Sequence, residues 1–467
     1  MIEISQEQLG QSLREENPWW GELLGVSPYF QSSRPRGFLG DFMGLVKSES
    51  HRREIVLLGP RRVGKTFLIH HTIQALIDSG VQKDRILYAQ IDNPIYVGSS
   101  LVEILDSFKQ VTGTDWRTQG CYVFFDEIQY LKDWEVHLKS LHDAGTKTRF
   151  IVSGSANAAL GMGSRESGAG RFTDFLLPPL TFAEFLNLRD LGNLIGRDEN
   201  GWFATDIEEL NREFLQYLNF GGYPEVALSK TLQENAVRFM RSDIIDKVLL
   251  RDLPSLYGIS DVRELNRLFT MLALNTGNEI SLDALASKSA VSKNTLKRYM
   301  EYLEAAFLIR PVMRVDQKAG RFQRDRAYKV MLTNPSLRTG LFNFVGEQNP
   351  ALGSLVETGI FSQRFHRIDQ HLHYARWKSG SKDQELDMVV LDPGLRVTEA
   401  VEVKYTDRVT KQRGEWEPWI AFCRENGLRE LTVTTRTVDE KIHAGGIGIH
   451  FVPSAIHAYR LGCGALL

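Results

Sequence analysis

The sequence has few cysteines and no long apolar run. Its three cysteines, among 467 residues, are widely separated and form no CxxC pair, which argues against a disulfide framework or a zinc site. No apolar run is long enough to cross a bilayer, and the first ten residues are too polar for a signal peptide. These absences predict a soluble, cytoplasmic protein that makes no contact with a membrane.

The sequence also lacks a charge excess. A formal net charge of −2 gives no general attraction to nucleic acid, so binding to DNA would need a local basic patch. The length is too great for one hydrophobic core and predicts about three domains.

A phosphate-binding loop is the clearest feature that is present. Residues 54–58 are an apolar stretch typical of a buried strand, and residues 67–77 have helical spacing. Between them stand Gly59, Pro60, Arg61, Arg62, Val63, Gly64, Lys65 and Thr66, the pattern GxxxxGKT. Backbone amides of such a loop surround phosphate groups, so we predict that these residues bind ATP. Lys65 is expected to contact the β- and γ-phosphates, and the Thr66 hydroxyl to bind Mg²⁺.

A second strand ends in two carboxylates. Residues 121–128 are an apolar run that ends in Asp126 and Glu127, as in a Walker B motif. Such a strand opens at the ligand edge of a parallel α/β sheet. We expect Asp126 to hold Mg²⁺ and Glu127 to polarise the attacking water, which predicts ATP hydrolysis.

Further strands are predicted at 85–92, 149–155 and 172–180, with helical segments between them. Alternating strands and helices indicate a parallel, doubly wound sheet. After residue 183 the pattern is helical to about residue 255.

Residues 261–335 read as three helices followed by a β-hairpin, which predicts a winged helix. The basic residues expected on its recognition helix and hairpin tip are Lys293, Lys297, Arg298, Lys318, Arg321 and Arg324. They could contact DNA phosphates, although winged helices also bind proteins.

Near the C-terminus, residues 385–391 and 395–405 read as two strands joined at Asp392-Pro393-Gly394. A tight hairpin would place Asp387 opposite Ala400 and Glu385 opposite Glu402. The residues then expected on one face are Glu385, Asp387, Glu402 and Lys404. Clustered carboxylates repel one another unless a cation neutralises them, and a divalent ion does so directly.

Asp387, Glu402 and Lys404 match the PD-(D/E)xK pattern of restriction-like nucleases, with Leu386 where proline is usual. Glu357, on a preceding helix, matches the acidic residue that many such nucleases carry. We predict Mg²⁺ binding by Glu357, Asp387 and Glu402, with Lys404 positioning water or neutralising charge. The alternative is an inactive nuclease fold. Nearby His366, His371 and His373 are expected to be surface or core residues.

Taken together, GPRRVGKT, FFDEIQ, VSGSA and GRFTDFLLPPLTFAEF resemble a prokaryotic family of AAA+ ATPases joined to a C-terminal domain of unknown function. The sequence is also similar to archaeal-type ATPases. The resemblance begins near residue 37 and continues through GGYP at 221–224, RDL at 251–253 and EVK at 402–404. It departs at residues 334–336, where relatives often have Asp and Gly.

The resemblance implies two further roles. A polar residue at the end of strand 149–155, Ser153 or Ser155, would sense the γ-phosphate. An arginine before the last strand, Arg165 or Arg171, would reach the γ-phosphate, either within its own chain or on a neighbouring subunit, and the second case requires a homo-oligomer.

The predicted fold is therefore α/β and multidomain. An N-terminal helical lead (1–36) precedes an AAA+ P-loop core (37–182), a helical lid or connector (183–255), a winged helix (256–335) and a nuclease-like α/β domain (336–467). The leading hypothesis is an ATP-regulated enzyme that acts on DNA. The alternative is a nucleotide-switched regulator with an inactive nuclease fold, and a third possibility is an adaptor that binds only proteins.

Overall fold

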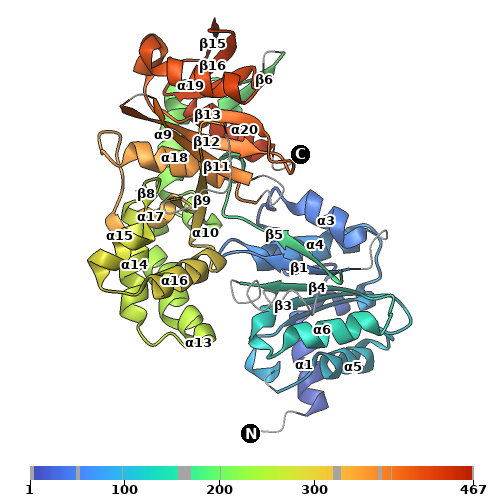
Figure 1. The fold of residues 1–467 in the computed structure, drawn as a ribbon. Helices are drawn as coiled ribbons and strands as arrows, with labels where there is room; N and C mark the ends of the chain where they lie inside the picture. The colour runs from blue at the N-terminus through green and yellow to red at the C-terminus, as the bar shows by residue number, and fades with distance from the viewer. Residues whose placement is uncertain are drawn as a thin grey trace. The chain divides into compact units, whose positions relative to one another are not determined.

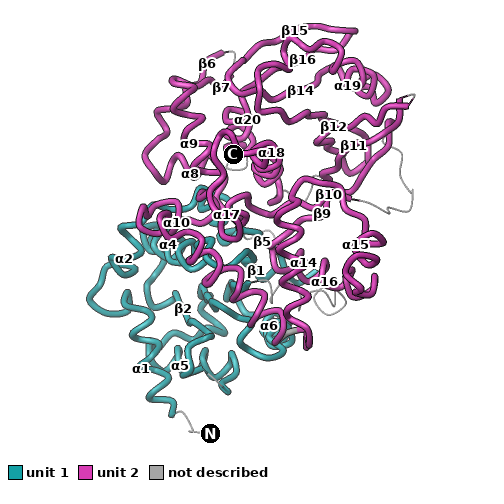
Figure 2. The backbone as a smooth tube through the Cα atoms, turned by 90° about the vertical axis from the view of Figure 1, so that its left-hand side faces the viewer, with its two compact units in different colours: residues 1–177, 466 teal, residues 178–465, 467 magenta. Residues whose placement is uncertain are grey.

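The computed structural model describes residues 5–48, 53–96, 98–155, 170–199, 201–318, 328–366, 371–379 and 381–464. The chain divides into two compact units, residues 1–177 and residues 178–465 (Figure 2). No helix in these ranges is both long and apolar enough to span a membrane.

The first unit is built on a five-stranded sheet in the order β2-β3-β4-β1-β5. Its strands are β1 (Glu54–Leu58), β2 (Ile86–Gln90), β3 (Tyr122–Asp126), β4 (Arg149–Gly154) and β5 (Phe172–Leu176). Every pairing is parallel, which confirms the predicted doubly wound sheet. Its helices include α1 (Gln6–Glu16), α2 (Pro28–Gln31), α3 (Leu39–Lys47), α4 (Lys65–Asp78), α5 (Leu101–Thr112) and α6 (Trp134–Asp143), and they lie on both faces of the sheet (Figure 1).

The N-terminal segment belongs to this sheet. The Asn17 side chain donates to the Tyr88 carbonyl and accepts from the Tyr88 amide, each at 2.7 Å. The Trp19 indole donates to the Ile86 carbonyl at 3.2 Å. Strand β2 is an edge strand, and these bonds satisfy backbone groups that would otherwise be open to another chain. The predicted lead of residues 1–36 is thus part of the first unit.

The second unit contains a nine-stranded mixed sheet in the order β15-β16-β14-β13-β12-β11-β9-β10-β8. Its strands are β8 (Glu279–Ile280), β9 (Ile309–Val315), β10 (Tyr328–Leu332), β11 (His371–Ser379), β12 (Lys382–Leu391), β13 (Val397–Glu402), β14 (Glu430–Thr435), β15 (Glu440–Ala444) and β16 (Ile447–Pro453). A separate hairpin is formed by β6 (Ile195–Asp198) and β7 (Gly201–Ala204).

Helices surround the larger sheet. They include α8 (Phe182–Leu188), α9 (Ile207–Phe220), α14 (Val262–Leu274), α15 (Leu282–Ser289), α16 (Lys293–Ala305), α17 (Ser336–Phe342), α18 (Leu352–Ser362), α19 (Arg413–Glu425) and α20 (Ser454–Cys463). Shorter helices are α10 (Pro224–Leu228), α11 (Lys230–Glu234), α12 (Ala236–Phe239) and α13 (Leu253–Tyr257), with π-helical turns at Met240–Ile245 and Lys247–Asp252.

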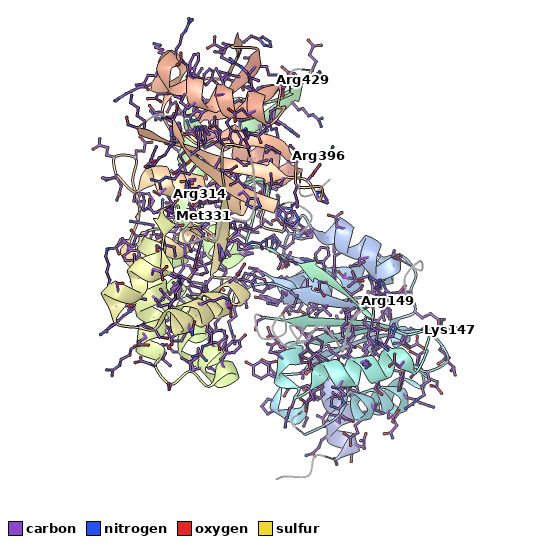
Figure 3. All side chains as sticks on the ribbon, in the orientation of Figure 1. Lys147, Arg149, Arg314, Met331, Arg396 and Arg429 are labelled. Carbon is purple, nitrogen blue, oxygen red and sulfur yellow. The ribbon has the colours of Figure 1, made fainter. Side chains whose placement is uncertain are left out.

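Helices α14, α15 and α16 precede the antiparallel pair β9–β10, in the order expected for residues 261–335. The pair does not stand alone, because β9 pairs in parallel with β11 through His373↔Met313 and Ala375↔Val315. Arg314, labelled beside Met331 in Figure 3, donates to the Arg376 carbonyl on β11 at 2.9 Å. One sheet therefore runs across the predicted boundary at residue 335.

Two apolar cores cover the larger sheet. One contains Phe182 and Phe214 of the segment predicted as a lid, together with Val401 of β13. The other contains Trp377 of β11 and Trp419 of α19. The sheet is therefore covered by apolar side chains on both of its faces. The start of the predicted lid is thus part of the core of the second unit.

Candidate functional site

The phosphate-binding loop has a backbone that its glycines permit. Gly59 follows β1, and a Cβ atom there would lie 2.3 Å from the Leu177 carbonyl oxygen. Gly64 has φ of 94°, a left-handed conformation that favours glycine, and α4 begins at the next residue. The first turn of α4 carries no acidic side chain, so its unpaired amides remain suited to an anion.

Lys65 lies inside this loop. Its ammonium donates to the carbonyls of Gly59 and Pro60, each at 3.0 Å, and its side chain is buried. Burial lowers the pKa of Lys65, while the carboxylates of Glu127 and Asp126 oppose this shift. A cation held by neutral carbonyls at a helix N-terminus is suited to exchange them for phosphate oxygens.

Asp126 is the centre of the hydrogen-bonding network at the end of β3. Thr66 Oγ1 donates to its Oδ2 at 2.7 Å, and the Tyr88 hydroxyl donates to the same oxygen at 3.0 Å. Ser153 Oγ is hydrogen-bonded to its other oxygen. The two predicted Mg²⁺ ligands, Thr66 and Asp126, are therefore neighbours, and their oxygens are of the kind that Mg²⁺ prefers. These residues fit the ion.

Tyr88 is a member of this site that sequence reasoning missed. It is buried on β2, and burial, together with the Asp126 carboxylate, raises its pKa so that the hydroxyl stays a donor. The available signal was a single tyrosine in an otherwise aliphatic strand two residues before its end.

Glu127 has an unusual backbone. Its φ of 55° is rare for a residue with a side chain, and its amide donates to Ser153 Oγ at 3.3 Å. Burial raises the pKa of Glu127, partly opposed by Lys65. Gln129, which was not predicted, donates to its carboxylate. A positioned carboxylate with a raised pKa has the properties of a general base.

The sensor and finger candidates differ in their surroundings. Ser153 contacts Asp126 directly, whereas the buried Ser155 hydroxyl has no hydrogen-bond partner among the described residues. Arg171 pairs with Asp143 at 2.8 Å near the surface. Arg165 lies outside the described residues. The roles of these four residues remain predictions.

One buried arginine also supports the loop. The Arg36 guanidinium donates to the Val63 carbonyl, and Arg36 is 4% exposed. It lies just before the predicted core at residue 37, so that boundary was placed too late to include it.

In the C-terminal hairpin the predicted register is wrong by two residues. Val389, not Asp387, lies opposite Ala400, and Met388 pairs with Val401. One residue of this shift comes from a longer turn, in which the Asp392 amide donates to the Arg396 carbonyl at 2.9 Å. The other comes from a bulge beside Val390. A shift of two preserves the alternation of faces and brings Asp387 next to Glu402.

The predicted carboxylates do gather there. The Val403 amide donates to Asp387 at 3.0 Å, and the Asp387 amide donates to Glu402 at 3.4 Å. Lys404 Nζ lies 2.5 Å from Glu402. Burial, together with the Asp387 carboxylate, raises the pKa of Glu402, against the opposing effect of Lys404.

A lysine that was not predicted lies among the other carboxylates. Lys329 of β10 places its Nζ 2.7 Å from Glu357, 2.7 Å from Glu385 and 3.3 Å from Asp387. Burial alone would lower the pKa of Lys329, but these carboxylates raise it. Burial and the neighbouring carboxylates raise the pKa of Glu357 to about 8. Because an amine holds a proton far more tightly than a carboxyl group, the proton between Lys329 and Glu357 stays on Lys329.

The two lysines approach the carboxylates from different sides. Lys329 lies 5.4 Å from the ring centre of Tyr374, which belongs to one core. Lys404 lies 5.9 Å from that of Trp419, which belongs to the other. A bulge between β11 and β12 at His373/Ala375 interrupts the alternation on which the prediction depended.

These residues do not fit the predicted Mg²⁺ in this arrangement. Across the described ranges, no three His, Cys, Asp or Glu side chains are placed to hold a metal ion. Lys329 fills the position toward which Glu357, Glu385 and Asp387 converge. His373 donates a hydrogen bond from Nδ1 to the Met313 carbonyl at 3.2 Å and takes no part in the cluster.

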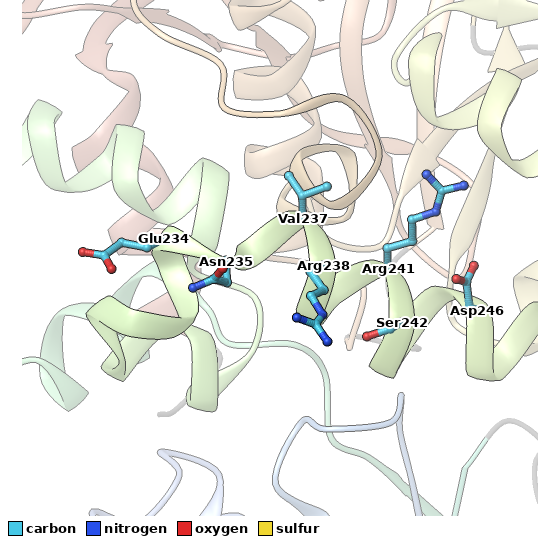
Figure 4. Close-up of a pocket in the computed structure, with 7 residues that line it drawn as sticks. All are labelled: Glu234, Asn235, Val237, Arg238, Arg241, Ser242 and Asp246. Carbon is cyan, nitrogen blue, oxygen red and sulfur yellow. The ribbon is translucent and has the colours of Figure 1, made fainter.

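The predicted basic surface is described only in part. Lys293 and Lys297 at the start of α16 are exposed, and they pair with Asp283 at 2.6 Å and Glu301 at 3.8 Å. Arg321 and Arg324 lie outside the described residues. A hollow of about 380 Å³ lies elsewhere in the second unit, beside the π-helical turns (Figure 4). Its lining contains none of the predicted site residues.

The GGYP stretch is a buried packing turn. A Cβ atom on Gly222 would lie 2.2 Å from the Asn334 side chain, and the Gly222 carbonyl accepts from the Leu180 amide at 3.0 Å. Asn334, where the sequence departs from its relatives, therefore contacts the motif rather than any proposed catalytic group.

Comparisons with known proteins agree with the first unit. Residues 51–186 match the family described as an AAA domain, and residues 211–348 match a domain of unknown function, DUF8612. An uncharacterized protein of Methanocaldococcus jannaschii is 24% identical over 394 residues, covering 83% of this chain and 82% of its own. An uncharacterized protein of Mycobacterium tuberculosis is 27% identical over 347 residues, covering 73% and 68%.

Two solved structures are more distant. The Orc1 protein of Aeropyrum pernix, determined in complex with DNA, is 13% identical, with 69% of this chain and 95% of that chain covered and a TM-score of 0.31. Cdc6p from Pyrobaculum aerophilum is 12% identical, with 70% and 96% covered and a TM-score of 0.27. Scores this low establish no common architecture. The family matches confirm the resemblance to an AAA protein with an added domain of unknown function.

Proposed function

We propose that this chain, an AAA domain joined to a domain of unknown function, binds ATP with Mg²⁺ and hydrolyses it. The observation that carries the proposal is the network in which Thr66, Tyr88 and Ser153 all contact Asp126 beside the loop that holds Lys65. A chance motif would not bring the end of β3, the start of α4 and the end of β4 to one carboxylate.

Each residue then has a role. The loop amides and Lys65 bind the phosphates, and Thr66 and Asp126 would hold Mg²⁺, which when bound neutralises phosphate charge. Glu127 orients the attacking water and accepts its proton. Ser153 links Glu127 to Asp126, so a change at the γ-phosphate can reach both carboxylates.

The test compares wild type with Lys65→Ala and Glu127→Gln. We expect Lys65→Ala to lose binding of a fluorescent ATP analogue. Glu127→Gln should bind it with unchanged affinity while hydrolysis, followed by phosphate release, falls by about 100-fold or more, the usual size of a lost general base. Wild type that binds no nucleotide would overturn the proposal.

We also propose that the second unit binds DNA through the phosphate backbone and responds to the nucleotide. The support is the position of Lys293 and Lys297 on α16, whose side chains are 54% and 69% exposed. Surface ion pairs contribute only about 0–1 kcal/mol, so both lysines can exchange Asp283 and Glu301 for phosphates. The proposed contacts are to phosphates and carry no sequence information, so we expect the affinity they supply to be independent of the base sequence.

Salt dependence tests this proposal. Affinity for a DNA duplex, measured by fluorescence anisotropy, should fall steeply as the salt concentration rises. The double variant Lys293→Ala with Lys297→Ala should reduce the slope of log affinity against log salt concentration by about two, one for each lost phosphate contact. Lys288→Ala, on the neighbouring helix α15, is the control. If wild type binds no DNA even at low salt, the adaptor hypothesis replaces this one.

Metal-dependent cleavage of DNA is the competing candidate, and it would require Lys329 to give up its place among the carboxylates to a divalent ion. What favours it is the gathering of Asp387, Glu402 and Lys404. The test incubates supercoiled and single-stranded DNA with Mg²⁺ or Mn²⁺, with and without ATP, beside Lys404→Ala. DNA cleavage by wild type that is lost in Lys404→Ala would support this candidate. If wild type cleaves no DNA under any of these conditions, the regulator with an inactive nuclease fold is favoured.

A further inference from the structure

Lys329 is itself buried and forms three ion pairs, two with largely buried carboxylates and one with Glu385, which is 37% exposed. Its side chain is 4% exposed, and those of Glu357 and Asp387 are 12% and 13% exposed. An ammonium group has three N–H donors and no acceptor. The carboxylates of Glu357, Glu385 and Asp387 supply one acceptor for each donor, so the hydrogen-bonding capacity of Lys329 is filled.

The surroundings restrict any other occupant. Gly277 leaves room beside Glu357, because a side chain at that position would place its Cβ atom 3.0 Å from Glu357 Oε2. The oxygens of Glu357 and Asp387 lie 2.7 and 3.3 Å from Lys329 Nζ, whereas Mg²⁺ binds oxygens at 2.0–2.1 Å. If Mg²⁺ took the place of the ammonium, both carboxylates would have to move closer to it. Lys329 would first have to leave, and a buried ammonium without partners is strongly unfavourable.

The cluster also joins distant parts of the chain. Lys329 lies on β10, Glu357 on α18, and Asp387 on β12. Strand β10 belongs to the hairpin that follows α16, whereas α18 and β12 belong to the predicted nuclease-like fold. The ion pairs therefore connect the proposed DNA-binding segment to the C-terminal strands within one unit.

We propose that Lys329 is the built-in cation of this cluster, which occupies the position of a divalent ion and makes the C-terminal fold independent of metal. Lys329 balances charge that would otherwise repel, and it excludes Mg²⁺ or Mn²⁺ while its ion pairs are intact. The inference stands apart from the proposed ATPase, because none of its residues belongs to the phosphate-binding loop.

The experiment removes the lysine charge and asks whether a metal takes its place. Every protein carries Thr66→Ala, so that Mn²⁺ is not held at the phosphate-binding loop. Thermal unfolding is followed with EDTA and with Mn²⁺, and bound Mn²⁺ is counted by electron paramagnetic resonance. Lys329→Met keeps the length and apolar stem of the side chain. Lys404→Met is the matched control, because it removes the other lysine of the cluster and leaves Lys329 in place.

We expect the Thr66→Ala parent to unfold at the same temperature in EDTA and Mn²⁺ and to bind no Mn²⁺ tightly. Lys329→Met should unfold at a lower temperature in EDTA, recover in Mn²⁺, and bind one ion per chain. Lys404→Met should not acquire an ion.

Two results would overturn the proposal. One is a tightly bound Mn²⁺ in the parent that Asp387→Asn removes. The other is Lys329→Met that is as stable as the parent in EDTA and binds no ion. If Lys329→Met does not fold, the parent and Asp387→Asn decide the question by their Mn²⁺ binding alone.

Discussion

Asp126 shows how one residue can organise a site. Its two oxygens accept from three hydroxyl groups on α4, β2 and β4, and it is 1% exposed. A buried carboxylate is tolerated only when its lone pairs are satisfied, so each hydroxyl contributes to both stability and position.

Tyr88→Phe removes one of these donors without changing shape. Two hydroxyl donors and the Glu127 amide remain, so we expect a loss of about 1 kcal/mol in the free energy of unfolding and a fall in ATP hydrolysis of about fivefold. Chemical denaturation and steady-state kinetics measure the two effects. Tyr122→Phe, at the start of the adjacent strand β3, is the control, and equal effects of both substitutions would contradict a special role for Tyr88.

The pH dependence of hydrolysis follows from Glu127. As a base it must be unprotonated, and burial raises its pKa above the ordinary value of 4.5. Hydrolysis should therefore decline as the pH falls through this raised pKa, at a higher pH than an exposed glutamate would give. Measurement of kcat from pH 5 to 9 tests this, with ATP binding followed in parallel. An unchanged kcat down to the ordinary pKa would contradict the assignment.

At the scale of elements, the N-terminal segment covers the edge of the five-stranded sheet. Asn17 fills both backbone positions of Tyr88 on β2, the same residue whose hydroxyl contacts Asp126. The N-terminal segment therefore supports the nucleotide site through one strand.

Asn17→Ala should be more destabilising than its size suggests. It deletes two hydrogen bonds to a buried edge strand and leaves both backbone groups unpaired, so we expect a loss of about 2–4 kcal/mol in the free energy of unfolding. Chemical denaturation measures it, with the exposed Gln11→Ala on α1 as control. A loss similar to that of the control would show that the segment does not support β2.

The register between β12 and β13 also acts at the scale of elements. Asp387 and Glu402 come together because a longer turn and a bulge each shift the hairpin by one residue. Either change alone would have turned Glu402 to the other face. The proximity of the two carboxylates was predictable from alternation, but their partners were not.

At the scale of the whole molecule, the proposal joins an ATPase unit to a DNA-binding unit. If the nucleotide regulates DNA, affinity for duplex DNA should differ between ATP-bound Glu127→Gln and the nucleotide-free protein. By linkage, DNA should change ATP affinity by the same factor. Anisotropy measured in both directions tests this, and Lys65→Ala should show no response to ATP. Equal affinities in all states would show that the two units act separately.

The sequence alone predicted the candidate nucleotide site, because its two motifs are each made of residues adjacent in the chain. GxxxxGKT and the DE pair each lie within eight residues, and local backbone geometry sets their conformation. It also predicted the parallel sheet from alternating strands and helices. Only the tertiary structure revealed Tyr88, Arg36 and Lys329, since each acts on groups that are distant in sequence. Lys329 is 28 residues from Glu357 and 58 from Asp387. Such contacts depend on which strands pair and in what register, and that is decided by the packing of the whole unit.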